Sequence, residues 1–119
     1  MSDPCLALPA VTACYPEGNG LALVLDLTPA AAWFTGHFPG SPVLAGVVQL
    51  DWALLLAERC LGLGPLAAEA VQVKFKALIQ PEDRLILVLC WEPDRHRLRF
   101  DYHRDGTLCA SGRFQVASA

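Results

Sequence analysis

A histidine, a glycine and an aspartate in the first half of the chain have the residue types and spacing of a proton-transfer site. His37 lies in the segment Gly36-His37-Phe38-Pro39-Gly40, Gly46 follows at the expected start of a helix, and Asp51 lies fourteen residues after the histidine. Histidine accepts a proton near neutral pH, a carboxyl group donates one, and the unpaired N–H groups of a helix's first turn stabilise a developing oxyanion. These are the groups needed to remove a proton α to a carbonyl and expel a β-substituent.

Each of the three residues also has a purely structural interpretation. The helical neighbours of Asp51 three and four positions away are all apolar, so we do not expect the aspartate to lie in a solvated stripe. Because an unpaired carboxylate in such surroundings costs several kcal/mol, Asp51 is either functional or held by a loop backbone or a partner subunit. His37 can instead serve packing within its loop, and glycine is common at a helix start, as at Gly46.

The sequence carries no pattern for a metal ion or a phosphate-binding loop. It has no H-x-x-x-H pair, no paired-carboxylate site, and no Gly-rich loop followed by Lys-Ser or Lys-Thr. The cysteines are odd in number and form no C-x-x-C, which argues against a disulfide framework and a zinc site. We interpret all five as small buried hydrophobic residues: Cys5, Cys14, Cys60, Cys90 and Cys109.

The elements that must position these residues are one helix and a series of strands. Four Gly or Pro residues between 36 and 42 predict a shaped loop around His37, and residues 44–60 predict a helix. This helix is apolar on nearly every face, so we expect it to be buried. Apolar runs predict the remaining elements, which are strands at 10–15, 21–27, 71–77, 85–90, 97–103 and 108–116 and a hairpin turn at Asp105-Gly106. The order predicts one α+β domain, residues 1–119, with a curved antiparallel sheet wrapped around the helix.

The composition is unusually apolar and carries little charge. Hydrophobic residues make up 54% of the 119 residues, charged residues make up 18%, and the net charge is −3. This composition disfavours disorder and nucleic-acid binding, and the apolar surplus predicts a subunit interface, an apolar ligand tunnel, or both. Residues 1–58 contain no Lys or Arg for a leader peptide, and no uncharged apolar run reaches the ~18 residues of a membrane span. We therefore expect a cytoplasmic protein without a membrane segment.

A family resemblance is carried by residues 36–52, which read G-H-F-P-G-S-P-V-L-A-G-V-V-Q-L-D-W. This stretch resembles the β-hydroxyacyl-acyl-carrier-protein dehydratases of the hotdog fold, whose pattern is roughly H-F-P-x-x-P-V-x-P-G-V followed by Glu or Asp. The segment is most similar to the small thioester-dehydrase subgroup of aryl-polyene clusters. Residues 73–83 also resemble the family's strand after the helix. Ala45 departs from the pattern, because the family usually has a proline there that rigidifies the start of the helix.

The resemblance implies a dimeric hotdog fold and a dehydration that needs neither cofactor nor metal. His37 would remove the α-proton of a 3-hydroxyacyl thioester, and the Gly46 N–H would stabilise the enolate-like oxygen. Asp51, kept protonated by its apolar surroundings, would help the hydroxyl leave as water. The product would be the trans-2-enoyl thioester of fatty acid, polyene or related lipid biosynthesis. In this family the histidine and the acid come from different subunits beside an interfacial acyl tunnel, so we expect a homodimer or a higher even oligomer.

Substrates of this family arrive on acidic acyl carrier proteins or on coenzyme A. The cations of the expected strand faces, joined by Arg104, are candidates for docking such a partner. The principal candidates are Lys74, Lys76, Arg97 and Arg99. A solvated outer sheet face explains each of these cations as well.

Two other functions are compatible with the sequence. One is a hotdog acyl thioesterase, in which Asp51 and Gln49 would activate a water molecule against the thioester. The other is a non-catalytic dimeric protein that binds acyl groups. A 3-hydroxyacyl thioester distinguishes the two enzymes, because a dehydratase yields an enoyl thioester and a thioesterase yields a free thiol.

Overall fold

A six-stranded antiparallel sheet and one α-helix make up most of the described part of the chain. The computed structural model describes residues 8–29, 43–80 and 82–117. The strands are β1 (Ala10–Glu17), β2 (Gly20–Asp26), β3 (Ala68–Phe75), β4 (Leu85–Glu92), β5 (Arg97–Arg104) and β6 (Thr107–Val116). Helix α1 (Gly46–Cys60) lies between β2 and β3 in the chain, and a short 3₁₀ helix, η3 (Pro93–Arg95), connects β4 to β5.

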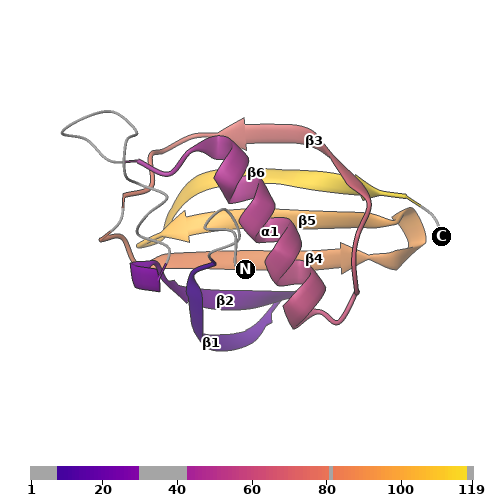
Figure 1. Cartoon of the computed structure of the whole chain (residues 1–119), viewed down its shortest axis with the longest axis horizontal. Coiled ribbons are helices and arrows are strands. Elements are labelled where there is room, and N and C mark those ends of the chain that lie inside the picture. Colours follow the sequence, from indigo (N-terminus) through magenta and orange to yellow (C-terminus); the bar gives the residue numbers. More distant parts are fainter. Residues whose placement is uncertain (1–7, 30–42, 81, 118–119) are drawn as a thin grey trace, which may run out of the picture.

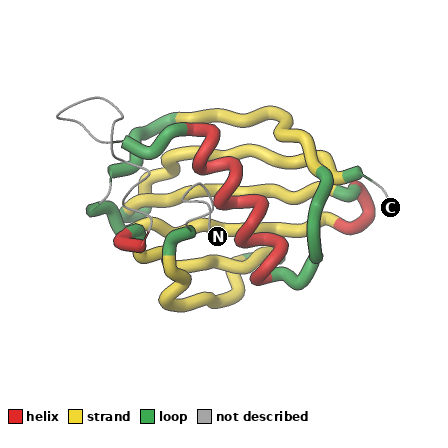
Figure 2. The backbone as a smooth tube through the Cα atoms, viewed as in Figure 1, coloured by secondary structure: helices red, strands yellow, loops and turns green. Residues whose placement is uncertain are grey.

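The sheet order places the strands that follow the helix beside those that precede it. Neighbouring strands follow the order β1-β2-β4-β5-β6-β3, and the pairings are antiparallel. The sheet curves around α1, which crosses it diagonally from the β3 side towards β1 and β2 (Figure 1). Figure 2 shows the helix on one face of the sheet. This is the predicted α+β architecture, with β1 and β3 as the two edge strands.

The core lies between α1 and the sheet face that it covers. Because side chains alternate across a strand, every second residue of the central strands points at the helix. The buried residues of β4 and β5 are Leu85, Leu87, Leu89, Leu98, Phe100 and Tyr102. From the helix, Trp52 and Ala53 pack against them and are almost completely buried. The layer of apolar contacts fixes the rotation of α1 about its own axis.

Helix α1 is buried against the sheet, as predicted, but one side of it stays uncovered in the single chain. Val48, Trp52 and Leu56 point at the sheet and are at most 4% exposed, whereas Val47 on another side of the helix is 66% exposed. A helix that lies on one face of one sheet can bury only the stripe that touches the sheet. The outward apolar side of α1 is therefore available to a second molecule.

Strand β3 departs from the regular alternation expected for residues 71–77. It begins three residues earlier, at Ala68, and ends two residues earlier, at Phe75. Its pairing with β6 slips between Val71 and Lys74, where Gln72 has a positive φ of 53°. This bulge changes which side chains face inward, and Phe75 is 52% exposed instead of buried.

The cysteines do not share one environment. Cys109 is buried as expected, but Cys14 and Cys60 are exposed and Cys90 is half-buried. Cys14 belongs to the edge strand β1, and Cys60 is the last residue of α1, so neither has the cover that a central position provides. The interpretation of all five as buried residues is therefore wrong for Cys14 and Cys60, and Cys5 lies outside the described residues.

Candidate functional site

The N-terminal turn of α1 has the backbone geometry expected of an oxyanion site. The helix begins at Gly46, and the N–H groups of Val48 and Gln49 donate to the Ala45 carbonyl at 3.1 and 3.2 Å. The N–H of Gly46, at the first position of the helix, has no acceptor within the helix. It carries the partial positive charge of a helix N-terminus, which favours a negatively charged oxygen.

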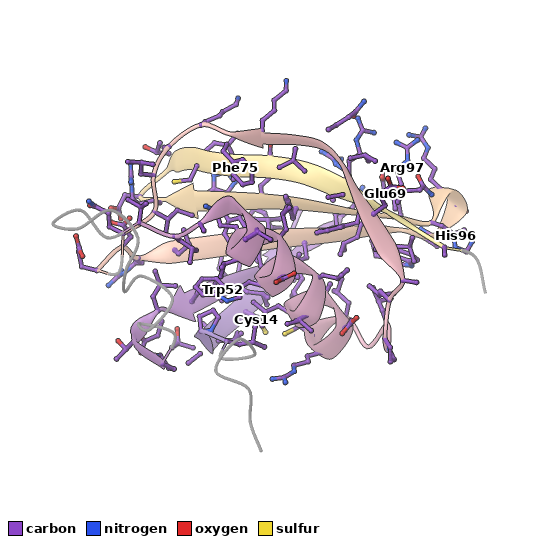
Figure 3. All side chains as sticks on the ribbon, turned by 45° about the horizontal axis from the view of Figure 1, so that its top comes forward. Cys14, Trp52, Glu69, Phe75, His96 and Arg97 are labelled. Atoms are coloured by element: carbon purple, nitrogen blue, oxygen red, sulfur yellow. The ribbon has the colours of Figure 1, made fainter. Side chains whose placement is uncertain are left out.

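The glycine at position 46 leaves room for the close approach of an aromatic ring. A Cβ atom on Gly46 would lie 2.7 Å from Cζ and 2.9 Å from Cε2 of Phe75, well inside ordinary contact. Figure 3 shows Phe75 on β3 near the first half of the helix. The half-exposed ring and the helix terminus therefore form one surface, and a methyl group at position 46 would disturb it.

The segment after β3 holds the start of the helix in place. The Leu44 N–H donates to the Ile79 carbonyl at 2.8 Å. Asp83 accepts a hydrogen bond from the Gln80 N–H at 2.7 Å and pairs with Arg104 at 3.6 Å. Arg104 also donates to the Leu78 carbonyl. Arg104 therefore braces this segment, and its guanidinium is already engaged within the chain.

Asp51 lies on the outward side of the helix, one turn after Val47. Residues four apart share a helix face, and both of these side chains are exposed in the single chain. The expectation that the carboxyl group lies in apolar surroundings is therefore wrong for one chain alone, because the apolar neighbours along the helix do not enclose it. His37 falls outside the described residues, so its position relative to Asp51 and Gly46 stays a prediction.

Gln49 and Tyr102 form a buried polar pair beneath the helix terminus. Gln49 is 4% exposed and its Nε2 donates to the Leu44 carbonyl at 3.1 Å. The Tyr102 hydroxyl, also buried, donates to the Gln49 carbonyl at 2.5 Å. Burial raises the pKa of the Tyr102 hydroxyl well above its ordinary value. Gln49 thus points into the core and Asp51 points to solvent, so the two do not converge on one water molecule within a chain.

The sequence patterns did not predict the hydrogen bond between Gln49 and Tyr102. The alternation of β5 places Tyr102 on the inner face, but nothing in it distinguishes a tyrosine that bonds to the helix from one that only packs. The signal that was available is chemical, because a buried hydroxyl or carboxamide needs a partner. The same signal is present at Gln49, because its carboxamide lies in a mostly apolar helix and needs a hydrogen-bond partner when buried.

The cations proposed for carrier docking are only partly gathered on one surface. Ser111 of β6 is paired with both Asp101 and Lys74, which places Lys74 on the outer sheet face together with Arg97 and Arg99. A groove of about 610 Å³ on this face is lined by residues that include Lys74 and Arg99 and also the carboxylates of Glu92 and Asp101. The outer face is therefore a mixed-charge surface in which cations predominate.

Lys76 and Arg97 differ from the other two docking candidates. Lys76 follows the end of β3, where its N–H donates to the Cys109 carbonyl at 2.7 Å, and its side chain is exposed. Arg97 is half-buried at the start of β5, next to His96 at the end of the sheet (Figure 3). The turn before it is firmly held, because the His96 carbonyl accepts the Val116 N–H at 2.8 Å.

A membrane-spanning helix and a metal-binding cluster are both absent from the described part of the chain. No helix there has the length and apolar character needed to cross a membrane. Within the same residues, no three His, Cys, Asp or Glu side chains come together in a group that could hold a metal ion.

Comparison with known proteins gives consistent matches. A family model described as ApeI-like, ApeI dehydratase, matches residues 14–113. One chain in the structure of the dehydratase heterocomplex ApeI:P from Xenorhabdus doucetiae is 31% identical to this protein and superimposes on it with a TM-score of 0.81. The match covers 92% of this chain and 98% of that chain. The 3-hydroxyacyl-[acyl-carrier-protein] dehydratase FabZ of Ehrlichia chaffeensis is 28% identical over 94% of this chain and 83% of its own length.

A more distant structural match supports the assignment of the fold but carries no information about function. A bifunctional dehydratase-cyclase domain of ambruticin biosynthesis is 21% identical, with a TM-score of 0.58 over 94% of this chain and 43% of its own. At this identity the likeness is one of fold alone. Together with the ApeI:P match, it confirms the predicted hotdog fold of a curved sheet around a single helix.

Proposed function

Because this chain belongs to the ApeI-like family of dehydratases, we propose that it removes water from a 3-hydroxyacyl thioester and releases the trans-2-enoyl thioester. The observation that carries the proposal is the first turn of α1. There the Gly46 N–H has no acceptor within the helix, and Asp51 follows in the second turn, where its backbone lies about 7.5 Å further along the axis. An oxyanion donor and an acid at this separation suit the two ends of a β-elimination.

Three residues divide the chemistry between them. His37 takes the proton from the carbon α to the thioester carbonyl, and the electron pair moves onto the carbonyl oxygen. The Gly46 N–H donates to that oxygen and lowers the energy of the enolate-like intermediate. As the electrons return to form the Cα–Cβ double bond, the Asp51 carboxyl group gives its proton to the departing hydroxyl, which leaves as water. The proton on His37 then returns to the Asp51 carboxylate through solvent.

We propose that a second copy of this chain completes the site. Asp51 is exposed in a single chain, and the apolar side chains of Val47, Phe75 and Leu78 around the helix terminus are 66%, 52% and 65% exposed. Exposed apolar groups of this size favour association. A partner that covers this surface removes water from Asp51 and supplies the His37 that acts with it.

A complementation experiment tests the shared site. The variants His37→Ala and Asp51→Asn are expected to be inactive as separate homodimers. Co-expressed in equal amounts, they form mixed dimers with one intact site, and about a quarter of wild-type activity returns. If both residues of a site belong to one chain, no mixture recovers activity, and the two-subunit arrangement is wrong.

The substrate is proposed to arrive on an acyl carrier protein. The FabZ relative is named for such a substrate, and the outer face of this chain offers Lys74, Arg97 and Arg99 to an acidic partner. Electrostatic docking weakens as salt is added. We therefore expect KM for a carrier-bound substrate to rise steeply with ionic strength, and a flat response would contradict carrier docking at this face.

The thioesterase alternative has less support. It required Asp51 and Gln49 to activate one water molecule, but the Gln49 carboxamide points into the core and is bonded to the Leu44 carbonyl. Incubation of the protein with a 3-hydroxyacyl thioester separates the two activities. We expect an enoyl thioester and no free thiol, whereas release of thiol without an enoyl product would refute the dehydratase.

A further inference from the structure

The junction between Leu44 and the first turn of α1 is fixed on two sides. The Leu44 N–H donates to Ile79, and the Leu44 carbonyl accepts the side-chain amide of Gln49 at 3.1 Å. The next carbonyl, that of Ala45, accepts the N–H groups of Val48 and Gln49. Two successive peptide planes are thus held, and the N–H of Gly46 belongs to the second of them.

Gln49 is itself anchored by a second element. The Tyr102 hydroxyl of β5 donates to its backbone carbonyl at 2.5 Å, and both residues are buried. An apolar side chain of the same length would fill this space without the cost of burying a carboxamide. Moreover, Gln49 Oε1 is buried and has no hydrogen-bond partner among the described residues. The polar side chain therefore has a use other than packing, and the bond to Leu44 identifies it.

The backbone conformation of Ala45 is one that a proline would also adopt, so the hydrogen bond from Gln49 can be compared with the restriction that a proline imposes. Ala45 has φ −65° and ψ 145°, and its N–H donates to no carbonyl of the described chain. A φ of −65° is the value that a proline ring imposes. A proline at this position would therefore restrict the junction covalently, whereas alanine leaves φ free to vary. In this chain the amide of Gln49 restricts the same junction by a hydrogen bond.

We infer that Gln49 is a positioning residue, which holds the Leu44 carbonyl so that the Gly46 N–H points at the thioester oxygen. It touches no reacting atom and acts through the peptide planes on either side of Ala45. The inference rests on the proposed function for its catalytic consequence, but the orientation of the Gly46 N–H is a property of the folded chain whatever the substrate.

The test compares wild type, Gln49→Met, Ala45→Pro and the double variant in a dehydration assay. Methionine keeps the length of the side chain but cannot donate to Leu44. Because the oxyanion interaction strengthens in the transition state, we expect Gln49→Met to lower kcat about 10-fold and leave KM within about 2-fold. Adding Ala45→Pro to Gln49→Met restores kcat to near the wild-type value. Full activity in Gln49→Met, or no recovery in the double variant, would overturn the inference.

Ala45→Pro alone keeps the test decisive if Gln49→Met does not fold. Its φ already suits proline, so it is expected to fold and to keep kcat within about 2-fold of wild type, since Gln49 already fixes the junction. A several-fold rise in kcat would mean that Gln49 does not fix it and would overturn the inference.

An NMR measurement separates failure of this inference from failure of the proposed function. The Gly46 amide should give one sharp resonance in wild type, a broadened or doubled one in Gln49→Met, and one again in the double variant. If wild type shows no dehydration but the resonance behaves in this way, the proposed function is wrong and the positioning role stands. An unchanged resonance in Gln49→Met would refute the positioning role alone.

Discussion

The contact between Gly46 and the Phe75 ring makes a quantitative prediction for Gly46→Ala. The added Cβ would lie 2.7 Å from Cζ of the ring, about 1 Å inside an optimal carbon–carbon separation. Overpacking of this kind costs about 1–3 kcal/mol, while alanine gains up to about 1 kcal/mol over glycine in a helix. Because Phe75 is 52% exposed, its ring can partly turn away, and a net loss of about 1 kcal/mol is expected.

A double-mutant cycle isolates the contact from the other effects of the methyl group. In a Phe75→Ala background the ring is gone, so Gly46→Ala should become neutral or stabilise by up to about 1 kcal/mol. The coupling energy between the two positions is therefore about 1–2 kcal/mol.

The assay is urea unfolding of the four proteins, followed by circular dichroism at one fixed protomer concentration because association also contributes to stability. The same free-energy change for Gly46→Ala in both backgrounds would mean that the ring does not lie on the glycine. In that case the close approach of Phe75 would not explain why a glycine stands at the start of the helix.

Three further predictions follow from other parts of the structure. Tyr102→Phe should lose about 1 kcal/mol from the missing bond to Gln49, and it should also change the response to alkali. Burial raises the pKa of Tyr102 in the folded protein above the unfolded value of 10.0. The free energy of unfolding of the wild type should therefore be unaffected by this group below pH 10 and should fall above it by about 1.4 kcal/mol per pH unit, whereas that of Tyr102→Phe should not. Denaturant titrations in which both proteins lose stability equally with rising pH would contradict this. Val47→Glu should leave the fold intact and shift the oligomer to monomers in analytical ultracentrifugation, and an unchanged dimer would place the interface elsewhere. Arg99→Gln should raise KM for a carrier-bound substrate without loss of stability, whereas Arg104→Gln should lower the melting temperature because Arg104 braces Asp83 and Leu78; the reverse pattern would exchange their roles.

The elements that depend on local chemistry could be predicted from the sequence. The Asp105-Gly106 hairpin has φ of 49° and 82° at its two turn residues, the positive values that an Asp-Gly turn favours. The helix and the central strands are marked by long apolar runs between Gly and Pro residues. Their bounds agree with the structure to within a few residues, since packing against neighbours decides only the ends.

The features that depend on pairing with distant residues could not be predicted. The bulge in β3 arises from its register with β6, and it places Gln72, which has no local turn signal, at a positive φ. The outward position of Asp51 follows from which stripe of α1 meets the sheet, and an almost uniformly apolar helix does not reveal that stripe. Similarly, no sequence pattern shows that the Tyr102 hydroxyl on β5 donates to the Gln49 carbonyl on α1, because the two residues are far apart in the sequence.

The most direct test of the proposed chemistry is the rate at which the purified protein converts a 3-hydroxyacyl thioester into its enoyl thioester, measured for wild type, His37→Ala and Asp51→Asn. General acid–base groups contribute about 10²–10⁴-fold each, so both variants should be slower than wild type by at least about 100-fold while keeping the wild-type fold. Equal rates in all three proteins, or the absence of an enoyl product from wild type, would contradict the assignment of His37 and Asp51 as the base and the acid.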